Sequence, residues 1–311
     1  MLIDTDLAKY YPQITIKKCI WNTLYETVYE VFDNSDKKDK YLKTIPFPPV
    51  PEILQMESFG CSHEDIRKKS DSFLRYSSLD VFAFHKQTEN GFNILPFQYK
   101  LIKHIYTDGN FTFYIMIITE KMIPVLNNLF QTYDEKAILQ LCLDLFPILI
   151  LNQSANRKIH KINLDNIYFY KGKYCIGDFF IKNCLFNYRD SLLEYSKMEM
   201  DYLPPEFFLD KQQTYYEIYS FGVLLYKLYN NNIFPYYTTI NSQNNEYEKN
   251  LALCKKINLE SLDPPINSDF YMSRIILKAC DPNMDKRYQN FAEMYKDYQE
   301  YLKIRNFSYS K

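Results

Sequence analysis

The first third of the chain contains segments rich in β-branched and aromatic residues, and this pattern predicts mostly β-strands. Five segments rich in β-branched and aromatic residues are expected to be strands: Gln13–Cys19, Thr27–Phe32, Tyr41–Phe47, Asn93–Ile105 and Phe111–Thr119. Polar turns are expected at Asp33–Lys40 and around Asp108-Gly109. Between the third and fourth strands, His63–Leu74 predicts a helix and Asp80–Phe84 a short strand.

From Asp134 onwards the apolar residues recur at helical spacing. Asp134–Asn152 has a wide apolar face, which predicts a core helix. Further elements are expected in this order: a hairpin of Ile167–Tyr170 and Tyr174–Ile176, a helix over Tyr215–Tyr229, a helix or loop over 240–260, and closing helices over Asp269–Cys280 and Asn290–Lys303. Strands followed by helices indicate an α+β chain with two lobes.

Composition narrows the class of protein. The chain has 311 residues, 47% of them hydrophobic, which is enough for one large domain or two coupled lobes. A formal net charge of -1 drives it toward neither nucleic acid nor an anionic membrane, so we expect no nucleic-acid partner. The seven cysteines form no C-x-x-C pair, which indicates reduced thiols and an intracellular protein, cytoplasmic or nuclear.

No membrane span is expected. The longest apolar runs, Phe113–Ile118 and Leu141–Leu151, are too short to cross a bilayer, and the second contains Asp144. The N-terminal residues show no signal peptide. Only six residues are glycine, and this matters because loops that cradle nucleotides need glycine.

Residues 157–183 carry two neighbouring motifs. Ile159-His160-Lys161 is followed by Asn166, and Asp178-Phe179-Phe180 comes after a short hairpin. This segment resembles the catalytic and metal-binding loops of eukaryotic-type protein kinases, H-R-D-L-x-x-x-N and D-F-G. The length of the hairpin between the two motifs is that of the family.

Three later segments resemble the same family in the same order. Leu203–Glu206 is similar to the A-P-E end of an activation segment, Glu217–Val223 to the D-x-W-S-x-G-V helix start, and Asp281–Arg287 to D-P-x-x-R-P. Thr119–Met122 lies where the hinge is expected. The resemblance implies a two-lobed protein-kinase-like fold over about 10–305, with a small β-rich N-lobe (1–120) and a larger helical C-lobe (121–311). It also implies that Glu206 and Arg287 form a buried ion pair and that Glu217 is structural.

The phosphate-binding loop of this family, G-x-G-x-x-G-x-V, is degenerate here. Val28 fits the valine, but the glycine positions hold Trp21, Thr23 and Glu26. Bulky side chains would block close approach of the backbone, and the carboxylate of Glu26 would repel phosphate. An ordinary β-hairpin explains this segment best.

Other nucleotide-binding positions are partly retained. Lys43 matches the lysine of the third strand, and Lys40 is the alternative. The sequence does not identify the glutamate that would pair with this lysine. The candidates for that partner are Glu57 and Glu64. The hinge residues Glu120 and Met122 are the remaining candidates for contact with a nucleotide.

The metal-binding and catalytic positions differ in what they retain. Asn166 and Asp178 match the two Mg²⁺ ligands, and they either bind ATP weakly with Mg²⁺ or Mn²⁺ or only shape the loop by hydrogen bonding. Phe180 replaces the D-F-G glycine, which restricts the backbone. Lys161 replaces the catalytic aspartate. If His160 is instead aligned with the histidine of the family motif, Ile162 takes that position. Neither is a general base, and losing that base costs ~10²–10⁴-fold in rate.

The resemblance therefore favours a pseudokinase, a catalytically inactive scaffold or allosteric regulator that requires no cofactor. Its expected partner is another protein, such as an active kinase or a trafficking or signalling complex. The stretch Thr119–Leu126 is also similar to T-E-x-x-x-P-L of SCY1-like pseudokinases. Two alternatives stay open: a divergent Ser/Thr protein kinase that transfers the γ-phosphate of ATP, and an atypical nucleotide transferase on the same fold.

Overall fold

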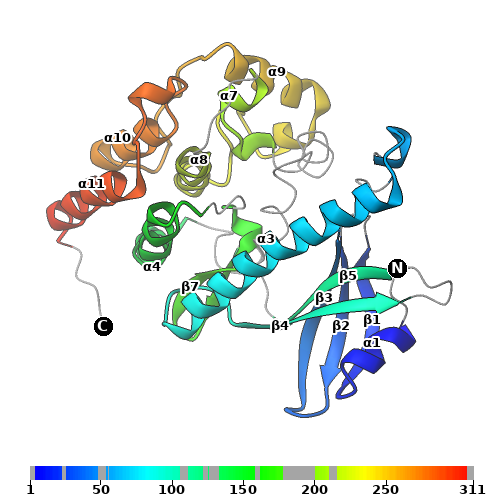
Figure 1. The fold of residues 1–311 in the computed structure, drawn as a ribbon. Helices are drawn as coiled ribbons and strands as arrows, with labels where there is room; N and C mark the ends of the chain where they lie inside the picture. Colours follow the sequence, from blue (N-terminus) through cyan, green and yellow to red (C-terminus); the bar gives the residue numbers. More distant parts are fainter. Residues whose placement is uncertain are drawn as a thin grey trace. The chain divides into compact units, whose positions relative to one another are not determined.

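The computed structural model describes residues 4–306 except 23–25, 48–53, 55, 106–110, 122–124, 126–132, 158–161, 178–199 and 210–215. The described residues fall into two compact units, one up to Lys121 and one from Val125 onwards. In Figure 1, where the colour runs from blue at the N-terminus to red at the C-terminus, the five-stranded sheet of the first unit is blue to green and the last helices of the second unit are orange and red. The α+β class expected from the sequence is confirmed.

The first unit is built on a five-stranded antiparallel sheet with the order β1-β2-β3-β5-β4. Its strands are β1 (Ile14–Asn22), β2 (Thr27–Asp33), β3 (Lys38–Phe47), β4 (Phe97–Ile105) and β5 (Phe111–Glu120). All five strands expected from the sequence are present. The turn between β2 and β3 is shorter than predicted, because the strands continue to Asp33 and start again at Lys38.

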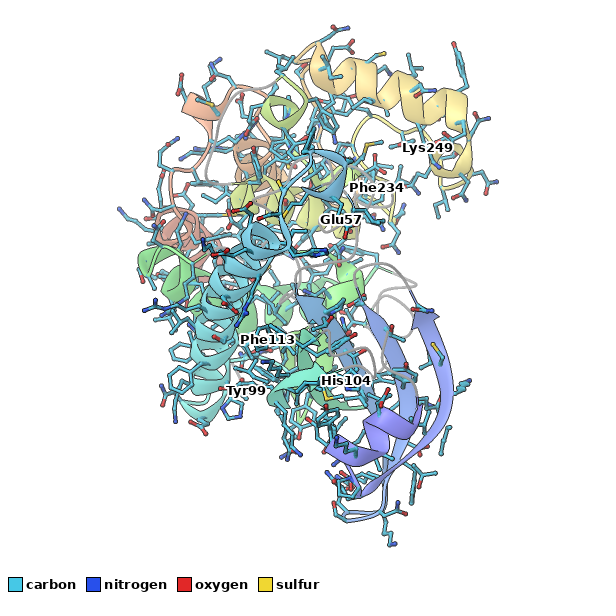
Figure 2. All side chains as sticks on the ribbon, turned by 45° about the vertical axis from the view of Figure 1, so that its right-hand side comes forward. Glu57, Tyr99, His104, Phe113, Phe234 and Lys249 are labelled. Atoms are coloured by element: carbon cyan, nitrogen blue, oxygen red, sulfur yellow. The ribbon has the colours of Figure 1, made fainter. Side chains whose placement is uncertain are left out.

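Helices line both faces of this sheet. The short helix α1 (Asp4–Tyr10), which the pattern did not predict, places Leu7 in a buried cluster with Val31 and Leu42. Helix α3 (His63–Glu89) packs on the opposite face, where the ring of His85 lies 5.5 Å from those of Phe97 and Tyr99. Tyr99 is labelled in Figure 2, next to this helix. Because alternate strand residues point to opposite faces, the two helices cover different residue sets.

The predicted strand at Asp80–Phe84 is wrong, since these residues belong to α3. Ser62 caps the helix with Asp65 in a reciprocal capping box, which sets the start. Val81 and Phe84 are three residues apart and both are buried, so they share one helical face. Packing of that face on the sheet outweighs the β-propensity of the short apolar stretch.

The second unit is mainly helical. It contains α4 (Glu135–Ser154), η2 (Leu164–Asn166), β6 (Ile167–Tyr170), β7 (Lys173–Ile176), η3 (Met200–Tyr202), α7 (Pro205–Phe208), α8 (Glu217–Tyr229), η4 (Asn241–Asn244), α9 (Glu246–Ile257), α10 (Phe270–Ala279), η5 (Met284–Lys286) and α11 (Phe291–Ile304). The predicted hairpin and the predicted core and closing helices are confirmed. The polar segment 240–260, left open between helix and loop, is largely helical.

Helix α4 is the centre of this unit. Its Asp144 is buried and accepts a hydrogen bond from the backbone N–H of Tyr174 in β7, and the hydroxyl of Tyr298 in α11 donates to the carbonyl of Leu139. By length and composition this helix could cross a membrane, and among the described residues no other helix could. Since over half of it is buried inside the protein, the structure shows no clear membrane span.

A close approach of α8 and α10 depends on Gly222. A Cβ atom at this position would lie 2.8 Å from the Cβ of Ala279 and from the Sγ of Cys280. Such distances are not tolerated between real atoms, so any side chain here would push the two helices apart. The Ser220-Phe221-Gly222 stretch is thus explained by packing.

Candidate functional site

Lys43 of β3 forms an ion pair with Glu26, the residue that stands at the third glycine position of the phosphate-loop pattern. The Nζ atom of Lys43 lies 3.0 Å from Oε2 of Glu26. The two side chains are only 13% and 7% exposed. The charge that would contact nucleotide phosphates therefore already faces a carboxylate of the same chain.

Strand register explains why these two residues meet. Val28 lies directly opposite Lys43 in the β2–β3 pair. Glu26 precedes Val28 by two residues and so lies diagonally across from Lys43 on the same face, within reach of a long side chain. Trp21 of β1 pairs with Val28 from the other side, so β1 and β2 are neighbouring antiparallel strands.

Lys40, the rival of Lys43, has a different role. It is buried and bridges Asp33 at 2.8 Å and Asp36 at 2.6 Å, which closes the β2–β3 turn. Burial by itself would raise the pKa of Asp33, but hydrogen bonds from Lys40 and Ser35 outweigh it and lower the pKa to about 2. This lysine is therefore a structural residue of the turn.

The glutamates considered as partners of Lys43 lie elsewhere. Glu64 pairs with Lys68 one turn further along α3 at 2.9 Å, and both side chains are more than 70% exposed. Glu57 is exposed and is labelled in Figure 2. One signal in the sequence points to Glu26. Side chains two residues apart in an extended segment lie on the same face, so Glu26 shares the face of Val28, which lies opposite Lys43.

The hinge candidates are only partly described. Glu120 ends β5, is 39% exposed and pairs with Lys38 of β3 at 3.2 Å. Its position opposite Lys40 in the β3–β5 register explains this contact. Met122 lies outside the described residues.

Asn166, one of the two predicted metal ligands, is fully buried at the end of η2. Its backbone carbonyl accepts a hydrogen bond from the N–H of Gly177 at 2.9 Å, which brings the residue before Asp178 next to it. Asp178, Phe180 and Lys161 lie outside the described residues. In the part of the chain that the structure describes, no three His, Cys, Asp or Glu side chains group as metal ligands.

Glu206 and Arg287 form the buried ion pair that the motifs predicted. The two nitrogens NH1 and NH2 of Arg287 donate to the two oxygens of Glu206 at 2.5 and 2.8 Å, with both side chains 5% exposed. Arg287 also donates to the carbonyls of Asp281 and Pro282, and its guanidinium lies 4.8 Å from the ring centre of Tyr219. The pair therefore joins α7 to the segment before α11.

Glu217 occupies the first position of α8 and is buried. A carboxylate at a helix N-terminus is favourable because the first backbone N–H groups carry partial positive charge. This placement agrees with the structural role expected for Glu217.

Comparison with known proteins does not assign the chain to a family. No protein-family model matches the chain, and no curated protein matches it either.

Proposed function

We propose that this protein is a pseudokinase, a protein-kinase-like chain that does not transfer phosphate and acts by binding another protein. The observation that carries the proposal is the buried ion pair between Glu26 and Lys43. In the family that the motifs resemble, the third-strand lysine contacts the α- and β-phosphates of ATP. Here that lysine is engaged by an internal carboxylate.

The energetics of the pair argue against nucleotide binding. A phosphate group that drew Lys43 away would separate it from the buried carboxylate of Glu26, and breaking a buried pair in this way costs ~3–5 kcal/mol. That cost equals a loss of ~10²–10⁴-fold in affinity. The phosphate would also meet the negative charge of Glu26 at close range.

Other positions support the same conclusion. Lys161 replaces the catalytic base, and the glycines of the phosphate loop are absent from the sequence. The residues that hold the fold together, Glu206 and Arg287, are kept and paired. A chain that keeps its structural residues and redirects its nucleotide-binding residues is suited to binding rather than to chemistry.

A thermal-shift titration with ATP and ADP, with and without Mg²⁺ or Mn²⁺, tests the proposal. A ligand that binds the native state raises its stability by about 2.7 kcal/mol at 100 times Kd, so binding is readily seen. We expect no shift for the wild-type protein at millimolar nucleotide. Glu26→Gln should gain a shift, because it removes the repulsive charge while keeping the shape of the side chain.

Glu30→Gln is the matched control, since Glu30 lies four residues further along, within β2, and pairs with Lys18 and Lys121 instead. It should behave like the wild type. A metal-dependent shift of the wild-type protein that Lys43→Ala abolishes would overturn the proposal. Assays for phosphate and for nucleotide transfer would then decide between a divergent kinase and an atypical transferase.

A further inference from the structure

The inner side of α9 is fixed to the rest of the second unit. Ala252 and Lys256 are buried there, and the Nζ atom of Lys256 donates to the backbone carbonyls of Met200, Asp201 and Leu203 at 3.0, 2.9 and 3.1 Å. Lys256 forms the floor of a cavity of about 800 Å³ that this side of the helix faces. An ammonium group has three donors and all of them are used, so α9 cannot turn about its axis without breaking them. The opposite side is therefore presented in one fixed orientation.

That outer side carries a stripe of exposed apolar residues. Tyr247 is 72% exposed, Leu251 is 39% exposed, and Cys254 is also exposed. Because the three are spaced by four and then three positions, they lie within an arc of ~60° around the helix axis. This is the spacing of the seam in a coiled coil. A helix ordinarily turns such a stripe toward a core, so its exposure on α9 indicates contact with another helix.

Two residues of opposite charge border the stripe on one side only. Glu248 and Lys255 are seven positions apart, so they lie nearly above one another, about 20° apart around the axis. Both are partly exposed, and neither forms an ion pair with another residue that the structure describes. The matching positions on the other side of the stripe are Asn250 and Ile257, which carry no charge.

This arrangement is complementary to itself when two copies of α9 run antiparallel. The charged border of each helix then meets the charged border of the other, so Glu248 of each copy faces Lys255 of the second copy. Leu251 lies close to the midpoint between the two charges, so it packs beside Leu251 of the second copy at the twofold axis. In a parallel pair the charged border would face Asn250 and Ile257, and neither ion pair would form.

We propose that two copies of this protein pair through α9, antiparallel, with Leu251 at the twofold axis and two reciprocal ion pairs between Glu248 and Lys255. A helix of this length, ~18 Å, covers less than the ~800 Å² per partner of a standard interface, so the dimer is weak and reversible. The inference goes beyond the proposed pseudokinase function and does not rest on it, because α9 contributes nothing to nucleotide binding.

Sedimentation velocity of the full chain, from about 1 µM to about 0.3 mM, tests the pairing, since a Kd up to ~0.1 mM is then well sampled. We expect the wild type to pass from monomer to dimer with concentration. Leu251→Asp should stay monomeric, because two carboxylates would meet at the twofold axis. Leu251 is an exposed position, so the variant is expected to fold.

Charge reversal gives the sharper test. Glu248→Lys and Lys255→Glu each bring like charges together in both pairs, so each should raise the Kd of its own dimer at least about tenfold, or ~1.4 kcal/mol. An equimolar mixture of the two variants should recover dimerisation, because one variant supplies two lysines and the other two glutamates. The double variant Glu248→Lys/Lys255→Glu should recover it as well.

Glu246→Lys is the matched control. It makes the same change of charge two positions away on the same helix, but about 200° around the axis from Glu248. Glu246 pairs at 2.8 Å with Lys249, which is labelled in Figure 2, and both residues line the cavity on the inner side of the helix. This variant should dimerise like the wild type.

Three results would overturn the proposal. The first is a wild type that stays monomeric up to about 0.3 mM, where a Kd of ~0.1 mM would show as dimer. The second is a dimer that Leu251→Asp and the two charge reversals leave unchanged. The third is a mixture of the charge-reversed variants that stays monomeric. Nucleotide titrations are separate measurements, so the dimer and the pseudokinase proposal can fail independently.

Discussion

Each unit of the molecule contains a buried ion pair in a segment that resembles a protein-kinase motif, but the two pairs differ in how they are built. Glu206 and Arg287 share two hydrogen bonds, and Arg287 has two further carbonyl acceptors. The Nζ atom of Lys43 lies 3.0 Å from Oε2 of Glu26. The first pair keeps the residues that the motif requires, whereas the second uses an acid where the motif requires glycine.

The difference teaches that burial alone does not reveal the role of a charge. An arginine that binds a carboxylate with two hydrogen bonds and also binds carbonyls holds the segments it joins in a fixed position, so we infer a structural role for it. A lysine is a flexible point charge that can change partner, so its role depends on which acid lies nearest. Glu26 therefore decides what Lys43 can do.

The largest effect is expected from Arg287→Ala. The change leaves the carboxylate of Glu206 buried without a cation, which should lower the free energy of unfolding by ~3–5 kcal/mol. Urea denaturation measures this. Arg305→Ala removes the exposed pair with Glu135 and should cost less than ~1 kcal/mol. Equal losses for the two variants would show that the buried pair has no special structural role.

A second prediction concerns the pair in the first unit. Lys43→Met alone should lower the free energy of unfolding by ~3 kcal/mol, since Glu26 stays buried and charged. The double variant Glu26→Leu/Lys43→Met should recover most of that loss, because apolar residues of similar size can replace a buried pair. Urea denaturation of the single and double variants gives the coupling. Additive losses would contradict a direct interaction between the two residues.

The smallest effect extends the comparison to Lys256, a buried cation whose ammonium group donates three hydrogen bonds to neutral carbonyls. Burial lowers its pKa from 10.5 to about 8, so between these values the unfolded state binds more protons than the folded state. The contribution of Lys256 to the free energy of unfolding should therefore rise with pH, by about 1 kcal/mol from about pH 7.5 to about pH 9. Urea denaturation across this range should show that rise in the difference between the wild type and Lys256→Met.

Lys249→Met is the control for this measurement, because Lys249 is half-exposed and should leave the rise unchanged. Buried thiols act in the opposite direction within the same range, so only the difference between the two proteins isolates Lys256. Burial raises the pKa of Cys280 to about 12, so the folded state holds that proton while the unfolded state loses it. A difference between the wild type and Lys256→Met that stays constant from pH 7.5 to 9 would refute the assignment to Lys256.

Much of the fold could be predicted from local pattern. Enrichment in β-branched and aromatic residues identified all five strands of the sheet, and helical spacing identified the core and closing helices. The error at Asp80–Phe84 arose because a short apolar stretch has the same composition in a strand and on a buried helix face. The length of α3 depends on its cap at Ser62 and on the sheet that it packs against.

The candidate site was harder to predict from the sequence. The motif order predicted that Glu206 and Arg287 would pair, since both residue types and their positions are defined by motifs. The partner of Lys43 was sought in the helical region, at Glu57 or Glu64, although the structure pairs it with Glu26. The cavity beside α9 left no mark in the sequence, because Lys256 is held by backbone carbonyls, which every residue has.

The sequence by itself determined the order of strands and helices, the α+β class and the absence of glycine from the hairpin that precedes Lys43. These properties follow from periodicity and residue type, which act over a few neighbouring positions. Only the tertiary structure decided which acid faces Lys43 and that Lys256 closes the floor of a cavity. Both depend on strand register and helix packing, which bring together groups that are far apart in the chain.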